Sequence, residues 1–480
     1  MRAHARRRAA DDPWCVWARR STFALVTTAH PPRASELGAL AAAITGRLTL
    51  PGDEAYEAER RPWNLSVDQR PLAVAHPVDV DDVRTLLAAA RDSGATIAVQ
   101  PNGHGASSAL ENSILVRTSA FDRLEIDADA RTAVLGAGVR WGAVVEALHG
   151  TGFAVPAGTS PVVGAAGYLL GGGHAWLSRS VGLGAQSLRA AWILRPDGAH
   201  ERVDDASDPD TMWALRGAGG LVGTVTELEI DLVEAPALCG GSLRFAATDG
   251  PAVLRALREL ADDAPDGLNA FANSMRMPDV PMVPEAVRGQ SFVTVDVVAM
   301  TERDLAVLDR VRAAATPQHE QLGPTSQLAI AAASLEPTDP SPSRGLALAL
   351  GRLDDATIDA LFAFHAEPAQ QALIGVNLRM LGGALDRPER PAFATLEGAR
   401  WLAMGLAPPF PGAPVEPGAA SLAGLDGILR PAASARMLPT FLDGADTLER
   451  CASSDAIARL GAIRAATDPD GVLHEGRLPR

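Results

Sequence analysis

The stretch Gln100-Pro101-Asn102-Gly103-His104-Gly105 follows the apolar run Ala95-Thr96-Ile97-Ala98-Val99, which itself follows a helix-like segment. A strand is therefore expected to end where a Pro/Asn/Gly turn begins. The turn holds a histidine between two glycines, and glycine lets the backbone approach a ligand closely. Histidine is a nucleophile that is often neutral near pH 7. The stretch alone leaves two roles open for His104: chemistry, or a hydrogen bond to the local backbone.

Two more glycine-rich blocks follow along the chain. The second begins Pro156-Ala157-Gly158-Thr159-Ser160-Pro161 and continues Gly164-Ala165-Ala166-Gly167-Tyr168-Leu169-Leu170-Gly171-Gly172-Gly173-His174-Ala175-Trp176-Leu177-Ser178-Arg179. The third reads Trp213-Ala214-Leu215-Arg216-Gly217-Ala218-Gly219-Gly220-Leu221-Val222-Gly223-Thr224-Val225-Thr226. Concave arrays of backbone N–H groups bind anions such as a pyrophosphate without cationic side chains. We expect the glycines at 171–173 to expose such amides; the alternative is a tight structural bend.

Composition excludes several classes of protein. The spacing of the glycines is not the Gly-x-Gly-x-x-Gly fingerprint, and the chain has no lysine, which excludes a P-loop and a Schiff base with pyridoxal phosphate. The net charge of -15 argues against nucleic acid as a partner. Cys15, Cys239 and Cys451 are too scattered for a metal site or a disulfide framework.

The sequence also bears on location. No apolar run reaches the ~18 residues that span a bilayer. We therefore predict a cytoplasmic protein without a membrane span, while the basic start with Arg19-Arg20 leaves an export signal as the alternative.

With three blocks in this order, the chain resembles the FAD-linked oxidases of the vanillyl-alcohol oxidase or PCMH-type superfamily, in the berberine-bridge-enzyme-like and 6-hydroxynicotine-oxidase-like branch. In that family the three blocks have the sequences R-G-G-G-H, P-A-G-x-x-x-x-V-G-x-x-G-x-x-L-G-G-G-x-G-W-L-S-R and W-A-L-R-G-G-G-G-N-F-G-V-V-T. The resemblance runs from about Leu50 to Leu232 and returns at Asp468-Pro469-Asp470-Gly471. It implies an α+β fold: a PCMH-type FAD-binding domain of two α/β subdomains, and a substrate domain with an antiparallel sheet covered by helices.

The domain organisation follows from this resemblance and from the absence of further glycine clusters of this kind after Leu232. We expect a disordered leader at 1–40, an FAD-binding domain at 41–235, a substrate-binding domain at 236–444, and a segment at 445–480 that returns to the first domain. Asp79 and Gly94 bound a predicted helix. The other expected strands are Ser113–Arg117, Arg123–Ile126, Thr132–Leu135, Leu188–Arg195, Ser291–Met300 and Leu373–Met380; the other expected helices are Trp141–His149, Glu302–Ala315 and Asp355–Glu367; the Pro-rich loops are Glu336–Pro342 and Pro408–Pro417.

In the family, the histidine of the first block bonds covalently to the 8α-methyl carbon of the flavin, and His104 occupies that position. Some relatives add a thioether from a cysteine where this chain has Ser160, so the resemblance implies FAD bound covalently through His104 only. Tyr168 either bonds the cofactor or packs in the core, and His174, at a variable family position, is interpreted as a satisfied local histidine. The predicted cofactor-binding residues are Pro101, Asn102, Gly103, His104, Gly105, Ser108, Gly158, Thr159, Ser160, Gly164, Gly167, Tyr168, Gly171, Gly172, Gly223 and Val225.

The catalytic residues are less clearly marked. Many relatives carry a tyrosine where this chain has Phe441, which cannot take a proton. The family landmark E-x-R-H-x-G-G-A appears as Asn377-Leu378-Arg379-Met380-Leu381-Gly382-Gly383-Ala384. On a strand Asn377 and Arg379 share one face. We predict both as catalytic, with Arg379 holding an anionic or enol oxygen; the alternative is a structural ion pair.

These residues predict an FAD-dependent oxidoreductase, a monooxygenase or oxidase of secondary metabolism. As an oxidase it would move a hydride from an alcohol, amine or secondary-metabolite substrate to flavin and then to O₂. An FAD dehydrogenase with another acceptor, and a non-catalytic flavin- or ligand-binding remnant of the fold, stay open. The expected partners are a small-molecule substrate and O₂, with no nucleic acid and no membrane, and the chain is expected to be a monomer or homodimer.

Overall fold

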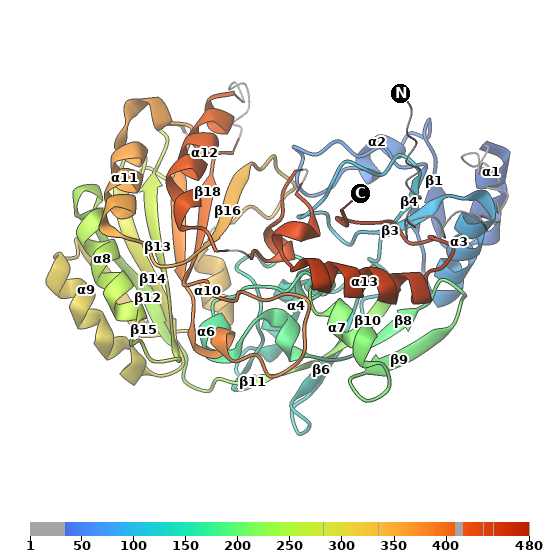
Figure 1. The fold of residues 1–480 in the computed structure, drawn as a ribbon, viewed down its shortest axis with the longest axis horizontal. Helices are drawn as coiled ribbons and strands as arrows, with labels where there is room; N and C mark the ends of the chain where they lie inside the picture. The colour runs from blue at the N-terminus through green and yellow to red at the C-terminus, as the bar shows by residue number, and fades with distance from the viewer. Residues whose placement is uncertain are drawn as a thin grey trace, which may run out of the picture.

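The computed structural model describes residues 34–281, 283–334, 336–408, 416–434, 436–444 and 446–479. Figure 1 shows two halves: the N-terminal part of the chain forms one together with the red C-terminal helix, and the middle of the chain forms the other. Cys15, Arg19 and most of the expected leader lie outside the described residues. Ala34–Ala43 form helix α1, with Leu37 and Leu40 buried, so regular structure begins before the expected boundary at residue 40.

In the first sheet, strand β3 ends where the first glycine block begins. Its order is β1-β2-β4-β3, with β2, β4 and β3 parallel and β1 antiparallel. Helix α3 (Val80–Ser93) packs on it and is bounded as expected: the Asp79 carboxylate accepts from the Asp82 amide at 2.9 Å, and Gly94 is left-handed with φ 71°. The remaining elements are β1 (Arg47–Thr49), α2 (Tyr56–Glu59), β2 (Ala73–His76), β3 (Thr96–Val99) and β4 (Ser113–Val116).

The second sheet is antiparallel, in the order β5-β6-β10-β8-β9. The strand expected at Leu188–Arg195 is confirmed as β8, which forms a hairpin with β9. Its strands are β5 (Leu124–Asp127), β6 (Thr132–Gly136), β8 (Leu188–Leu194), β9 (His200–Asp204) and β10 (Thr224–Asp231); the adjoining elements are α4 (Trp141–Leu148), β7 (Phe153–Ala154), α5 (Ala165–Leu170), α6 (Ser178–Val181), α7 (Pro209–Leu215) and β11 (Val233–Glu234).

The second half is a seven-stranded antiparallel sheet, in the order β15-β12-β14-β13-β17-β18-β16. Figure 1 shows α8, α9 and α11 along its outer side, whereas α10 lies toward α4 of the first half. The strands are β12 (Cys239–Ala246), β13 (Leu268–Arg276), β14 (Ser291–Ala299), β15 (His319–Pro324), β16 (Gly345–Leu350), β17 (Gly375–Met380) and β18 (Trp401–Leu406); the helices are α8 (Gly250–Ala261), α9 (Asp309–Ala314), α10 (Gln327–Ala333), α11 (Asp355–Ala366) and α12 (Glu416–Leu429). This architecture confirms the predicted α+β fold.

The end of the chain returns to the first half. Helix α13 (Ser454–Thr467) places the Arg459 guanidinium 4.1 Å from the ring centre of Trp213. Beyond it, the Ile97 amide donates to the Val472 carbonyl at 2.8 Å, and the His474 amide donates to the Ile97 carbonyl at 2.9 Å. These residues therefore extend the first sheet beside β3.

Two expected segments differ from the structure. The helix expected at Glu302–Ala315 is divided into a 3-10 helix, Glu302–Leu308, and α9; the first turn is tightened by reciprocal caps between Thr301 and Asp304. The loop expected to reach Pro417 ends earlier, because Glu416 and Pro417 already belong to α12, whose first turn tolerates proline; residues 409–415 of that loop lie outside the described residues. No helix in the described part of the chain is long and apolar enough to cross a membrane.

Candidate functional site

Two loops from the first and second blocks lie against each other. The Asn102 side chain donates to the Val162 carbonyl at 2.5 Å, and a Cβ on Gly164 would lie 3.3 Å from the Cβ of Pro101. A side chain at position 164 would therefore press on the first loop. The backbone N–H groups of residues 102–108 and 158–164, apart from Pro161, donate to no described residue. Such unpaired amides on adjoining loops suit an anionic ligand.

His104 lies beside these amides with its imidazole unprotonated. Its ring stacks on Trp63, with 4.2 Å between ring centres and 15° between planes. Neither ring nitrogen has a partner in the described part of the chain. Burial, with the nearby charge of Arg140, lowers the pKa of His104 to about 4. The neutral ring nitrogen is therefore available as a nucleophile at neutral pH.

Other buried polar atoms near the second block also lack partners. Buried polar groups in proteins are almost always hydrogen-bonded, so a cluster of unpaired ones indicates a missing polar ligand. Within the described residues, these atoms are Trp141 Nε1, Ser160 Oγ, Tyr168 Oη, both ring nitrogens of His174 and Trp176 Nε1. The interpretation of His174 as a satisfied local histidine is therefore wrong: its side chain is 2% exposed, and neither nitrogen bonds outside its own residue.

The glycines at 171–173 serve a different purpose from the expected one. The Gly171 amide donates to the Gly167 carbonyl at 3.2 Å and the Gly172 amide to the Leu169 carbonyl at 3.1 Å, so these two amides are not exposed. They close the end of α5, where carbonyls need donors. A Cβ on Gly173 would lie 2.4 Å from the Tyr168 ring. Gly173 thus leaves the room that the Tyr168 ring occupies.

The remaining predicted cofactor residues divide into two groups. Gly105 and Ser108 are exposed on the first loop, and Thr159 on the second bonds to Glu336 from the other half. Gly223 and Val225 lie at the start of β10, where Val225 pairs with Ile193, so their contacts are internal to the second sheet.

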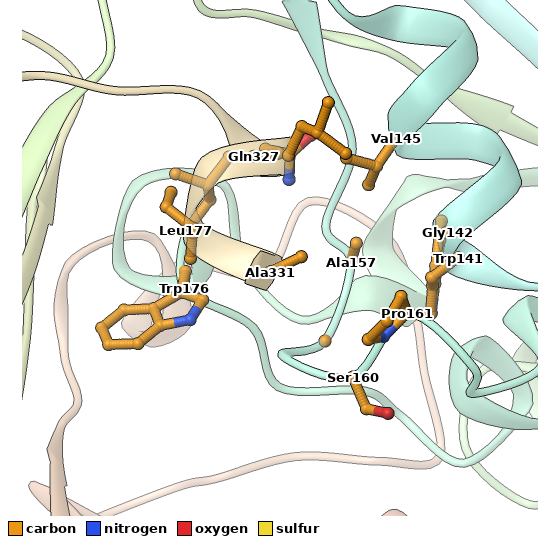
Figure 2. Close-up of a pocket in the computed structure, with 13 residues that line it drawn as sticks. Trp141, Gly142, Val145, Ala157, Ser160, Pro161, Trp176, Leu177, Gln327 and Ala331 are labelled. Atoms are coloured by element: carbon orange, nitrogen blue, oxygen red, sulfur yellow. The ribbon is translucent and has the colours of Figure 1, made fainter. Parts of the chain in front are cut away.

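Helix α10 closes one side of the second loop. The Gln327 side chain donates to the Val155 carbonyl at 2.6 Å and accepts from the Val155 amide at 2.9 Å. Figure 2 shows Gln327 and Ala331 of this helix facing Pro161 and Trp176 across a small cavity. The cavity measures about 30 Å³, room for about one water molecule. The two halves are therefore in close contact beside Ser160.

The seven-stranded sheet presents Asn377 and Arg379 toward the second block. Both side chains are partly exposed, whereas Leu378 between them is buried, as strand alternation requires. The Arg379 Nε donates to Asn377 Oδ1 at 2.8 Å, and its guanidinium lies 4.7 Å from the Phe271 ring centre. Arg379 acts electrostatically on both Tyr168 and His174.

Burial and the charge of Arg379 together shift the pKa values of His174 and Tyr168. Burial, with a smaller effect of Arg379, holds the pKa of His174 well below its ordinary value. Burial raises the pKa of Tyr168. Arg379 itself forms no ion pair with a described carboxylate, which excludes the structural ion pair considered above among those residues.

Comparison with known proteins agrees with this geometry. Residues 71–204 match the family model described as an FAD binding domain. The (R)-6-hydroxynicotine oxidase of Paenarthrobacter nicotinovorans is 29% identical over 246 residues, 49% of this chain and 54% of that protein. BBE-like 1 of Physcomitrella patens has the same fold, with a TM-score of 0.81, 18% identity, and coverage of 92% of this chain and 99% of that one. The chain therefore contains an FAD binding domain at residues 71–204 and shares its overall fold with these solved proteins.

A further structural neighbour concerns flavin attachment. Glucooligosaccharide oxidase from Acremonium strictum, with its 6-S-cysteinyl, 8α-N1-histidyl FAD, has a TM-score of 0.76 and 20% identity, covering 92% of this chain and 98% of that one. The matches to curated relatives span only 32% to 54% of the length of those proteins.

The residues of this chain fit an FAD. The two loops offer free amides for its diphosphate, and the unpaired side chains offer hydrogen-bond partners for a polar ring system. Sequence reasoning missed Trp63, His174 and Trp176 as members of the site. His174 and Trp176 lie within the second block, whereas Trp63 lies outside all three blocks and carries no signal of this kind.

Proposed function

We propose that this chain is an FAD-dependent oxidase of a small-molecule substrate. The observation that carries the proposal is the pair of loops with unpaired amides beside an unprotonated, unpaired His104. An anionic cofactor satisfies the amides, and a flavin ring satisfies the buried polar atoms around it. The match to the FAD binding domain covers this part of the chain.

His104 would hold the flavin by the single covalent link that the family resemblance implies. Trp63 stacks on the imidazole and fixes its plane, and burial keeps it unprotonated. Ser160 has no thiolate, so the thioether named for the glucooligosaccharide oxidase has no counterpart here. The other predicted cofactor residues on the two loops would bind through their backbone N–H groups, except Pro101, which has none.

On the substrate side, Asn377 and Arg379 would bind and orient the ligand. When bound, FAD supplies an acceptor for a hydride from a C–H bond next to oxygen or nitrogen, and O₂ takes up the electrons. Arg379 would hold an oxygen of the substrate, and the facing aromatic rings would exclude water. The alcohol, amine or secondary-metabolite substrate, the cytoplasmic location and the monomer or homodimer remain predictions of the sequence.

Spectroscopy and denaturation test this proposal. The purified protein should be yellow, lose its colour on anaerobic addition of a substrate, and regain it in air with release of H₂O₂. After denaturation, flavin fluorescence should stay with the wild-type band and be absent from His104→Ala. Bleaching without recovery in air would instead indicate a dehydrogenase, and a colourless protein that binds no FAD would contradict the proposal.

A further inference from the structure

A chain of hydrogen bonds runs across three strands from a cation to a carboxylate. The Arg379 Nε donates to Asn377 Oδ1 at 2.8 Å, Asn377 Nδ2 donates to Asn273 Oδ1 at 2.5 Å, and Asn273 Nδ2 donates to Asp296 Oδ2 at 2.6 Å. Every donor points from the arginine toward the aspartate. Since guanidinium only donates and carboxylate only accepts, the ends of the chain fix the orientation of both amides.

The register of the sheet explains why these side chains meet. Asn273 on β13 pairs with Asn377 on β17 and with Thr294 on β14, while Phe271 pairs with Arg379 and Asp296. All therefore lie on the face opposite the helix-covered one. On its far side, the Asp296 carboxylate also accepts from Ser242 Oγ at 2.5 Å and Thr294 Oγ1 at 3.1 Å. The carboxylate thus accepts hydrogen bonds from three side chains, those of Asn273, Ser242 and Thr294.

The other end of the chain leaves Arg379 unneutralised. No described residue accepts a hydrogen bond from its two Nη groups, and no described carboxylate pairs with it. Glu336 acts on it electrostatically, but that side chain is exposed and bonds to Thr159. A partly buried arginine without a carboxylate partner leaves a positive charge with which an anion can pair.

The surroundings of the guanidinium are flat and aromatic. Its carbon lies 4.7 Å from the ring centre of Phe271 and 5.8 Å from that of Phe441. Phe271 in turn stacks on Trp176 with 3.8 Å between centres. A planar anion that pairs with both Nη groups and contacts these rings has the chemistry that the site recognises.

We infer that Asp296 is a positioning residue that holds Arg379 through Asn273 and Asn377, so that its free Nη groups bind a carboxylate on a planar, aromatic substrate. The inference rests on the proposed function for the identity of the site as a substrate site. It deepens that function by naming the class of substrate. Asp296 acts on the ligand only through Arg379.

Calorimetric titration of the purified holoprotein with benzoate and with its neutral analogue benzamide tests the ligand class. Wild type should bind benzoate at least about tenfold more tightly than benzamide, as expected for a hydrogen bond to a charged group. Equal affinity for the two would overturn the carboxylate assignment. Calorimetry needs no turnover, so it gives an answer even where the protein proves to hold no flavin and the proposed function fails.

Variants of the chain test the positioning role. Asp296→Leu should weaken benzoate binding about tenfold, because Asn273 loses its carboxylate acceptor. Asn273→Leu should have the same effect, because it removes the acceptor of Asn377. Asp296→Asn should bind benzoate within about threefold of the wild-type affinity, since the new amide oxygen can accept the same hydrogen bond from Asn273. Ser242→Ala, which removes a bond outside the chain, should bind as wild type. Wild-type affinity in both leucine variants would overturn the role.

A second measurement reports on Arg379 directly. Its Nε–H resonance, identified in ¹⁵N spectra by its absence from Arg379→Lys, should shift in Asp296→Asn and in any leucine variant that folds, and stay in place in Ser242→Ala. A resonance unmoved in all variants would show that Asp296 does not reach Arg379.

Discussion

Acid should destabilise the flavin-free protein through His104. The pKa of this imidazole is about 4 in the folded protein, against an ordinary value of 6.5. A group with a depressed pKa favours the folded state where it is neutral, so this contribution is present above pH 6.5 and is lost as the pH falls toward 4. The difference between these two pKa values corresponds to about 3 kcal/mol in the free energy of unfolding.

The matched variant is His104→Phe, which keeps a ring to stack on Trp63 but takes up no proton. Urea unfolding of flavin-free protein, followed by tryptophan fluorescence, gives the free energy of unfolding near neutral pH and near pH 4. Wild type should lose about 3 kcal/mol more than the variant over this range. The other titrating groups are the same in both proteins and cancel in the difference. Parallel pH profiles would refute the reasoning, since they would mean that the imidazole is solvated.

Three further changes have defined outcomes. Arg379→Ala should lower turnover about a hundredfold, by loss of about 3 kcal/mol of transition-state stabilisation, while flavin content and melting temperature hold; loss of flavin would mark the residue as structural. Ser160→Cys should add a second flavin bond, detected by mapping on the peptide carrying the substitution, because the serine hydroxyl is buried and unpaired. Gly173→Ala should lower the melting temperature and the flavin content, since its Cβ would lie 2.4 Å from the Tyr168 ring at φ +64°; Gly461→Ala, which meets nothing within 4 Å, is the control.

Local signals in the sequence were sufficient for the elements that frame the site. The cap at Asp79 and the left-handed Gly94 set α3, and the turn after Val99 ends β3 as predicted. Alternation along a strand placed Asn377 and Arg379 on one face. These features depend on neighbours within a few residues, which a sequence displays directly.

What the sequence concealed depends on distant contacts. Asn102 meets Val162 across 60 residues. Asp296 joins Asn377 only through the register of β14, β13 and β17. His174 was judged from its variable position in the family, whereas its ring lies beside Phe271 of the other half and has no polar partner among the described residues. Gly171 and Gly172 were misread because a run of glycines looks the same whether its amides are free or close a helix.

The pairing of β3 with the end of the chain has a consequence for biosynthesis. Ile97 lies three residues before the first loop. Its amide bonds to Val472 and its carbonyl to His474, so neither bond can form until the end of the chain has been synthesised. A nascent chain can therefore form α3 and the first parallel strands early, but the strand edge that supports His104 is completed only by the last part of the chain to emerge. Completion of this edge would then follow release from the ribosome, and a stalled or C-terminally cleaved product would lack both bonds to Ile97.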